Sequence, residues 1–163
     1  FIPMSMVVHF GALRLMTAFW RLHGFPVRVL FRNPLQMRGF RDFWSRRWNL
    51  AYSEMMARAV KQPLAPIIGE KWSVFAVFLI SGLLHELAIT VPVQAGYGLP
   101  TLFFLIHGVF TMLEKKHHMV NAVACAVLLI VGLPYLFNKK FQAEVIMPSR
   151  DVFKLTELTQ WKK

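Results

Sequence analysis

The fold is decided by residues 72–93, which read WSVFAVFLISGLLHELAITVPV. The stretch is apolar almost throughout, and its ionisable residues are His85 and Glu86, side by side near its middle. A helix needs about 20 mostly apolar residues to cross the hydrocarbon core of a bilayer. The stretch therefore predicts a membrane-spanning helix with two ionisable residues at membrane depth.

The overall composition agrees with a membrane protein. The chain has 163 residues, of which 56% are hydrophobic and 14% aromatic, and its mean hydropathy is +0.45. The formal net charge is +11, which on a soluble chain would suggest nucleic-acid binding. Here the basic residues flank the apolar runs, so anionic lipid headgroups and membrane orientation explain them more plainly. No nucleic-acid partner is predicted.

Three further apolar segments extend the pattern. Ile2–Leu22 and Met119–Phe137 are long enough to span, whereas Thr101–Leu113 is short. We expect the short segment to begin in the preceding glycine-rich turn, to tilt, or to re-enter the membrane. The predicted fold is an all-α, multi-spanning membrane bundle, with residues 1–138 as its membrane portion and 139–163 as a polar, basic tail.

Residues 27–71 between the first two apolar segments are strongly basic. Their basic residues are Arg28, Arg32, Arg38, Arg41, Arg46, Arg47, Arg58, Lys61 and Lys71. The positive-inside rule predicts that this segment lies on the cytoplasmic side. From Gly39 to Val60 there is no proline and no internal glycine, so we predict one amphipathic helix at the membrane interface, closed by Pro63 and Pro66. Its apolar face would carry Phe40, Trp44, Trp48, Met55 and Ala59.

The side of the tail cannot be fixed by the charge rule. If the polar turn at residues 114–118 is cytoplasmic and Met119–Phe137 crosses once, the tail lies outside. Yet Lys139 and Lys140 directly follow that span, which favours the cytoplasm. One apolar run is then not a full crossing, and the sequence leaves open which one.

The sequence lacks the residues that several functional classes require. Cys125 is the only cysteine, so no disulfide framework forms within this chain, and we expect it to be a buried small apolar residue. Ile89 stands where a zinc-protease helix would need its second histidine, and we predict no metal site. The chain begins at Phe1 without a signal-peptide pattern, which we interpret as a fragment or an incomplete gene product.

His85 and Glu86 are the first candidates for chemistry, because ionisable residues at membrane depth are costly. A neutral imidazole can take a proton from a hydroxyl and release it later. The alternative is a structural contact between helices, with Glu86 paired to a basic residue. Gly82 would let substrate or another helix approach the imidazole, and His107 could line the same cavity or form a helix contact.

The second candidate is the segment FWSRRWN at residues 43–49. Trp44, Trp48, Arg46 and Arg47 suit an interfacial anchor, with tryptophans at the headgroups and arginines on phosphates. Asn49 stands out as a neutral amide among bulky aromatic residues.

These two segments, in this order and spacing, resemble the membrane-bound O-acyltransferase superfamily, and within it the wax synthase branch. The resemblance spans roughly Val8–Leu136 and includes GYGLPT at residues 96–101 and LIHG at residues 105–108. It implies a buried histidine and an upstream asparagine facing a chamber inside the bilayer. Acyl-CoA would enter from the cytosol and a lipophilic alcohol through the membrane.

Carried over residue by residue, the resemblance implies His85 as catalytic base and Asn49 as its partner. Substrate would contact Arg46 and Arg47, through the CoA phosphates, and also Trp44, Trp48, Glu86 and His107. The expected product is a wax-type ester, with acyl-CoA as co-substrate and no other cofactor. Alternatives are another acceptor, such as a sterol, glycerolipid or saccharide, or a non-catalytic membrane subunit or truncated remnant.

Overall fold

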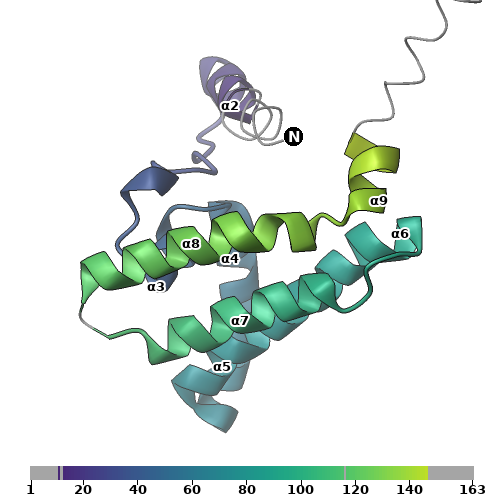
Figure 1. Cartoon of the computed structure of the whole chain (residues 1–163). Coiled ribbons are helices and arrows are strands. Elements are labelled where there is room, and N and C mark those ends of the chain that lie inside the picture. Colours follow the sequence, from purple (N-terminus) through teal and green to yellow (C-terminus); the bar gives the residue numbers. More distant parts are fainter. Residues whose placement is uncertain (1–10, 12, 116, 147–163) are drawn as a thin grey trace, which may run out of the picture.

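The computed structural model describes residues 11, 13–115 and 117–146, whose regular elements are all helical. In chain order they are α2 (Leu13–Leu22), η2 (Pro34–Gln36), α3 (Phe40–Arg46), α4 (Leu50–Met56), η3 (Ala57–Lys61), α5 (Gln62–His85), η4 (Glu86–Thr90), α6 (Val91–Val93), α7 (Leu99–Leu113), α8 (His118–Leu136), α9 (Lys139–Phe141) and η5 (Gln142–Ile146). Helices α7 and α8 run side by side, and α5 lies behind α7 (Figure 1). The predicted all-helical class is confirmed.

Two helical stretches among the described residues are long and apolar enough to cross a membrane. One is the stretch Leu50–Val93, which is kinked at Gly69 and contains the predicted span at 72–93, and the other is α8. Helix α7 has 15 residues and follows Gly98, whose φ of 84° only glycine adopts readily. The expectation that this short apolar segment begins in the glycine-rich turn is therefore confirmed.

The prediction of one amphipathic helix from Gly39 to Val60 is wrong. Helix α3 ends at Arg46 and α4 begins at Leu50, because Asn49 between them has left-handed backbone angles of φ 42° and ψ 64°. Asparagine tolerates that region better than most residues. The predicted apolar face also fails after the break, since Met55 is half exposed while its neighbour Met56 is buried.

The prediction that Pro63 and Pro66 close the interface helix is also wrong. Pro63 lies in the first turn of α5, which directly follows the π-helical turn η3, and the chain stays helical across it. The helix continues past Pro66 to Gly69, whose φ of 82° and ψ of 160° make the actual kink. The helix is therefore interrupted at Gly69, which adopts the non-helical conformation readily, and not at either proline.

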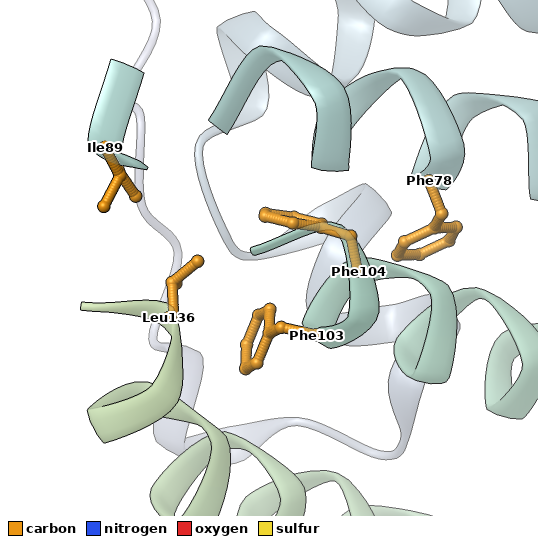
Figure 2. Packing of buried hydrophobic residues seen from close by; sticks show 5 residues of the cluster. All are labelled: Phe78, Ile89, Phe103, Phe104 and Leu136. Carbon is orange, nitrogen blue, oxygen red and sulfur yellow. The ribbon is translucent and has the colours of Figure 1, made fainter. Parts of the chain in front are cut away.

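Two aromatic clusters hold the helices together. The first joins α5, η4, α7 and α8, and Figure 2 shows its buried members Phe78, Ile89, Phe103, Phe104 and Leu136. The second joins α3 to α8 through Phe40, Phe43 and the fully buried Cys125. The expected role of Cys125 as a small buried apolar residue is confirmed.

Glycines set the closeness of the helix packing. A Cβ on Gly82 would lie 2.8 Å from the Thr101 Cα of α7, and one on Gly108 would lie 2.9 Å from the Phe78 Cβ of α5. Helices α5 and α7 therefore touch backbone to backbone near His85. The sequence predicts that either substrate or another helix approaches Gly82, and in the structure it is helix α7.

Parts of the predicted first span and tail lie outside the described residues. For Ile2–Leu22 the structure describes the C-terminal half as α2, in which Arg14 is exposed. For the tail it describes α9 and η5, whereas residues 147–163 fall outside.

Candidate active site

His85 is the last residue of α5, and its hydrogen bond leaves one nitrogen for chemistry. Its Nδ1 lies 2.7 Å from the Ser81 backbone oxygen. Because a carbonyl oxygen only accepts, Nδ1 carries the proton, and Nε2 of the neutral ring keeps its lone pair. The imidazole is half-buried and packs on Phe104 of α7, with ring centroids 4.3 Å apart.

Asn49 is fixed by its own helix. It is the N-cap of α4, and its Oδ1 accepts a hydrogen bond of 3.4 Å from the Tyr52 backbone N–H. The turn is braced from outside, because the Leu50 N–H donates to the Leu30 oxygen at 2.9 Å. With the amide oxygen occupied, the Nδ2 group is the part of Asn49 that can donate to a ligand.

Tyr52 and Ser81 connect the two candidate residues. The Tyr52 hydroxyl donates to Ser81 Oγ at 3.0 Å, and Ser81 Oγ donates to the Val77 oxygen at 2.7 Å. Tyr52 lies one turn after Asn49, and Ser81 lies one turn before His85. The Tyr52–Ser81 hydrogen bond connects α4 and α5 within one turn of Asn49 and of His85. The described side chains of Asn49 and His85 form no direct hydrogen bond with each other.

The Tyr52–Ser81 contact was missed at the sequence level. Both residues lie at helical spacing from a candidate, Tyr52 three residues after Asn49 and Ser81 four before His85. That spacing was the available signal. The partner helix could not be known, because the break at residues 47–49 was not predicted.

Glu86 is bound by hydroxyl and backbone groups instead of the basic residue that the structural alternative expected. Its Oε2 accepts from Thr90 Oγ1 at 2.6 Å, and its Oε1 accepts from both the N–H and Oγ1 of Thr101 at 3.0 Å. Thr101 lies in the first turn of α7, where N–H groups have no helical partner. Glu86 therefore caps α7 from the neighbouring helix.

Glu86 also borders an open cavity of about 440 Å³. The other lining residues come from the glycine-rich turn and α7, and they are Tyr97, Gly98, Thr101, Leu102 and Leu105. A second cavity of about 470 Å³ lies between α2 and α4, with Trp20, Leu50 and Glu54 among its lining residues. Neither cavity has His85 or Asn49 in its lining.

His107 and Trp44 continue the aromatic contacts that begin at His85. His107 is 1% exposed, and its Nδ1 lies 2.8 Å from the Phe103 oxygen. Its ring centroid is 5.4 Å from that of Trp44, and the Trp44 centroid is 5.6 Å from that of Phe104. Phe104 thus contacts both His85 and Trp44, and the sequence-predicted residues on α3, α5 and α7 meet around it.

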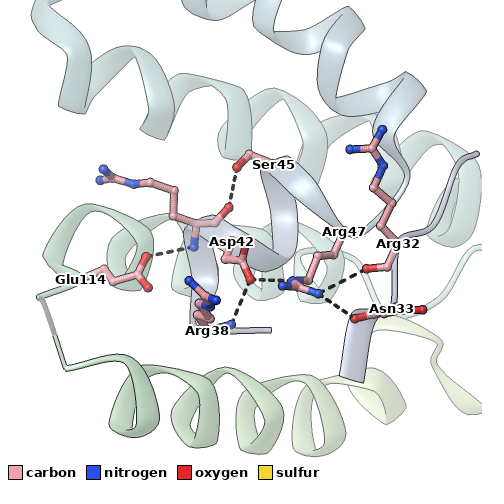
Figure 3. A network of polar contacts seen from close by, with 8 residues as sticks. Arg32, Asn33, Arg38, Asp42, Ser45, Arg47 and Glu114 are labelled. Carbon is pink, nitrogen blue, oxygen red and sulfur yellow. Dashed lines mark hydrogen bonds and ion pairs between the residues drawn. The ribbon is translucent and has the colours of Figure 1, made fainter. Parts of the chain in front are cut away.

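Arg46, the last residue of α3, and Arg47, its C-cap, differ in their partners. Arg47 Nε lies 2.5 Å from Asp42 Oδ2, and its Nη1 donates to the Asn33 oxygen at 3.0 Å, as Figure 3 shows. Burial alone would raise the pKa of Asp42, but hydrogen bonds from Arg47 and from the Arg38 backbone N–H outweigh it and lower this pKa. Arg46 is exposed, which leaves its charge available to a ligand.

Trp48 belongs to the packed interior of this segment. Its ring stacks on Phe43 with centroids 5.5 Å apart, and it meets Phe31 edge-on at 4.9 Å. These contacts hold Trp48 in the turn that precedes Asn49. Of the two tryptophans, Trp44 therefore lies with the candidate histidines and Trp48 supports the turn.

The fold and the site describe a helical membrane protein with a half-buried histidine between packed helices. The family described as "Membrane bound O-acyl transferase family" matches residues 27–106, which include both candidate segments. The chain belongs to the membrane-bound O-acyltransferase family.

Curated plant proteins are similar to this chain. Probable long-chain-alcohol O-fatty-acyltransferase 2 of Arabidopsis thaliana is 32% identical over 135 residues, covering 71% of this chain and 39% of that protein. Long-chain-alcohol O-fatty-acyltransferase of Simmondsia chinensis is 32% identical over 100 residues, covering 56% and 28% respectively. Acyl-CoA–sterol O-acyltransferase 1 of Arabidopsis thaliana is 32% identical over 92 residues, covering 52% and 27%. No solved structure matches.

These three matches thus span between about a quarter and two fifths of the length of each relative. The family assignment rests on the part of the chain that holds α3 to α7.

Proposed function

We propose that the protein takes part in transfer of a fatty acyl group from acyl-CoA to the hydroxyl of a long-chain alcohol. The observation that supports this most is the His85 hydrogen bond, which reserves Nε2 as a proton acceptor while the ring packs against Phe104. The names of the similar plant proteins supply the substrate class.

The proposed step needs no covalent enzyme intermediate. His85 Nε2 takes the proton as the alcohol oxygen attacks the thioester carbonyl carbon. The carbonyl oxygen gains negative charge, and in this proposal the Nδ2 group of Asn49 donates to it or orients substrate. The C–S bond then breaks, the ester is released, and the CoA sulfur recovers the proton from His85.

Binding roles follow from which groups remain available. Arg46 offers an exposed guanidinium for the CoA phosphates, whereas Arg47 holds the α3 turn. Trp44, His107 and Glu86 border the packed region between α3, α5 and α7, and Trp48 supports it. We further propose that residues 1–138 are the membrane portion of a multi-pass protein, with residues 27–71 on its cytoplasmic side.

A sterol acceptor is the second candidate, because one similar protein is named as a sterol O-acyltransferase. Membranes carrying the complete coding sequence would be incubated with radiolabelled palmitoyl-CoA and either 1-octadecanol or a sterol. Ester from the fatty alcohol supports the first proposal, and ester from the sterol alone replaces it. Asn49→Ala should reduce turnover at least tenfold; unchanged turnover would remove Asn49 from the mechanism.

A further inference from the structure

Two nitrogen atoms in the aromatic region stand out because both are buried. Nε1 of Trp44 and Nε2 of His107 have no hydrogen-bond partner anywhere in the part of the chain that the structure describes. Buried polar side-chain atoms nearly always have a partner. The two side chains contact each other, with ring centroids 5.4 Å apart and planes at 84°.

The two atoms have complementary hydrogen-bonding roles. The indole Nε1 can only donate. His107 Nδ1 donates to the Phe103 oxygen at 2.8 Å, so Nε2 of the neutral ring can only accept. A group that satisfies both must accept one hydrogen bond and donate another. A carboxylate cannot donate and an ammonium cannot accept, whereas a hydroxyl does both.

The surroundings exclude most other polar ligands. Phe40 and Phe103 pack against the His107 ring, with centroids 5.8 and 4.3 Å away. Phe104 contacts Trp44 and also His85. A charged group would be poorly solvated among these rings, so the neighbourhood favours a small neutral hydroxyl.

We propose that Trp44 Nε1 and His107 Nε2 together bind one hydroxyl group, which accepts from the indole and donates to the imidazole. Two sources share this chemistry: a buried water molecule and the hydroxyl of an acceptor alcohol. The second source rests on the proposed acyltransferase function, whereas the site itself does not.

A double-mutant cycle on thermal unfolding tests the site. The full-length protein in detergent is compared with Trp44→Phe, His107→Leu and the double variant. Because either change alone removes the shared hydroxyl, their effects should fall short of additivity by about 2–6 °C in Tm. A control cycle of Phe103→Leu with His107→Leu measures coupling from ring packing alone. If His107→Leu does not fold, His107→Met replaces it in both cycles.

The same cycle distinguishes the sources. Excess coupling over the control without added alcohol indicates a buried water. Excess coupling that appears only with 1-dodecanol, and not with dodecane, indicates an alcohol hydroxyl. No excess coupling under any of these conditions overturns the proposal. Tm does not depend on turnover, so the cycle can be repeated in a His85→Ala background. The coupling therefore tests the hydroxyl site whether or not the acyltransferase proposal holds.

Discussion

At the scale of single residues, backbone hydrogen bonds decide which polar atoms remain for a ligand. The Nδ1–H groups of His85 and His107 each donate to the backbone carbonyl one turn earlier, so Nε2 of both rings remains as a hydrogen-bond acceptor. The Asn49 Oδ1 atom accepts a hydrogen bond from the Tyr52 N–H, so the side-chain amino group of Asn49 remains available as a donor. The site therefore offers accepting imidazoles and a donating amide.

Asp42 should stabilise the fold in a pH-dependent way. Its pKa is lowered in the folded protein, so its stabilisation is present above the unfolded-state pKa of about 3.9 and is lost as pH falls through the lower folded value. Asp42→Asn should cost about 1–3 kcal/mol at pH 7, and the difference from wild type should shrink on acidification. Thermal unfolding from pH 7 to pH 3 measures this, with the exposed Glu70→Gln as control. A constant difference at all pH values would contradict the assignment.

Arg46 and Arg47 should behave oppositely despite their adjacency. Arg47→Ala removes the ion-pair partner of Asp42 and should lower Tm by several degrees, because a mostly buried carboxylate then keeps only the Arg38 backbone N–H as partner. Arg46→Ala should leave Tm unchanged and raise the KM for acyl-CoA. Parallel unfolding and kinetic measurements compare them. A large loss of stability in Arg46→Ala would assign both arginines to the fold.

At the scale of elements, the contact between α4 and α5 places the asparagine segment beside the histidine helix. The link is the Tyr52–Ser81 hydrogen bond. Gly82 directly after it lets α7 approach α5, which brings Phe104 against His85. Three elements thus converge within one turn of His85.

Tyr52→Phe should test whether this link positions the site. Losing one hydrogen bond should cost about 0.5–1.5 kcal/mol of stability. If Tyr52 is a positioning residue, kcat should fall severalfold while the KM for acyl-CoA stays near the wild-type value. Ser81→Ala should give the same kinetic pattern, and the double variant should be no worse than either single one. Additive losses would mean that the two residues act independently.

The sequence allowed the apolar elements to be predicted, but not how the interface segment folds. Long apolar runs define α5 and α8 because bilayer thickness fixes their length. The break between α3 and α4 depends on the left-handed backbone of one residue, Asn49. The helix bends at Gly69 although Pro63 and Pro66 predict an earlier end. His85 and Asn49 are predicted as site residues from the sequence alone, whereas the link between Tyr52 and Ser81 depends on the tertiary contact between α4 and α5.

At the scale of the whole molecule, much apolar surface faces outward. On α8 the exposed residues include Val123, Val127, Ile130 and Val131. In a membrane protein such a surface contacts lipid or further helices. The similar plant proteins are much longer than the matched region, so both kinds of contact are compatible with family membership.

Topology can be tested with single cysteines in a Cys125→Ala background. If residues 72–93 cross the membrane, Ser45→Cys and Tyr97→Cys, both at exposed positions, should lie on opposite sides. A membrane-impermeant maleimide should label the former from the cytoplasmic face and the latter from the other face. Labelling of both from one face would contradict the crossing.

The proposed acyl transfer depends on His85 removing the hydroxyl proton of the alcohol. The most direct measurement is ester formation from radiolabelled palmitoyl-CoA and 1-octadecanol by membranes with equal amounts of wild-type, His85→Ala or His117→Ala protein, the last being an exposed histidine outside the site. We predict that His85→Ala loses at least a hundredfold in turnover, while His117→Ala matches wild type. Wild-type turnover by His85→Ala would contradict the account.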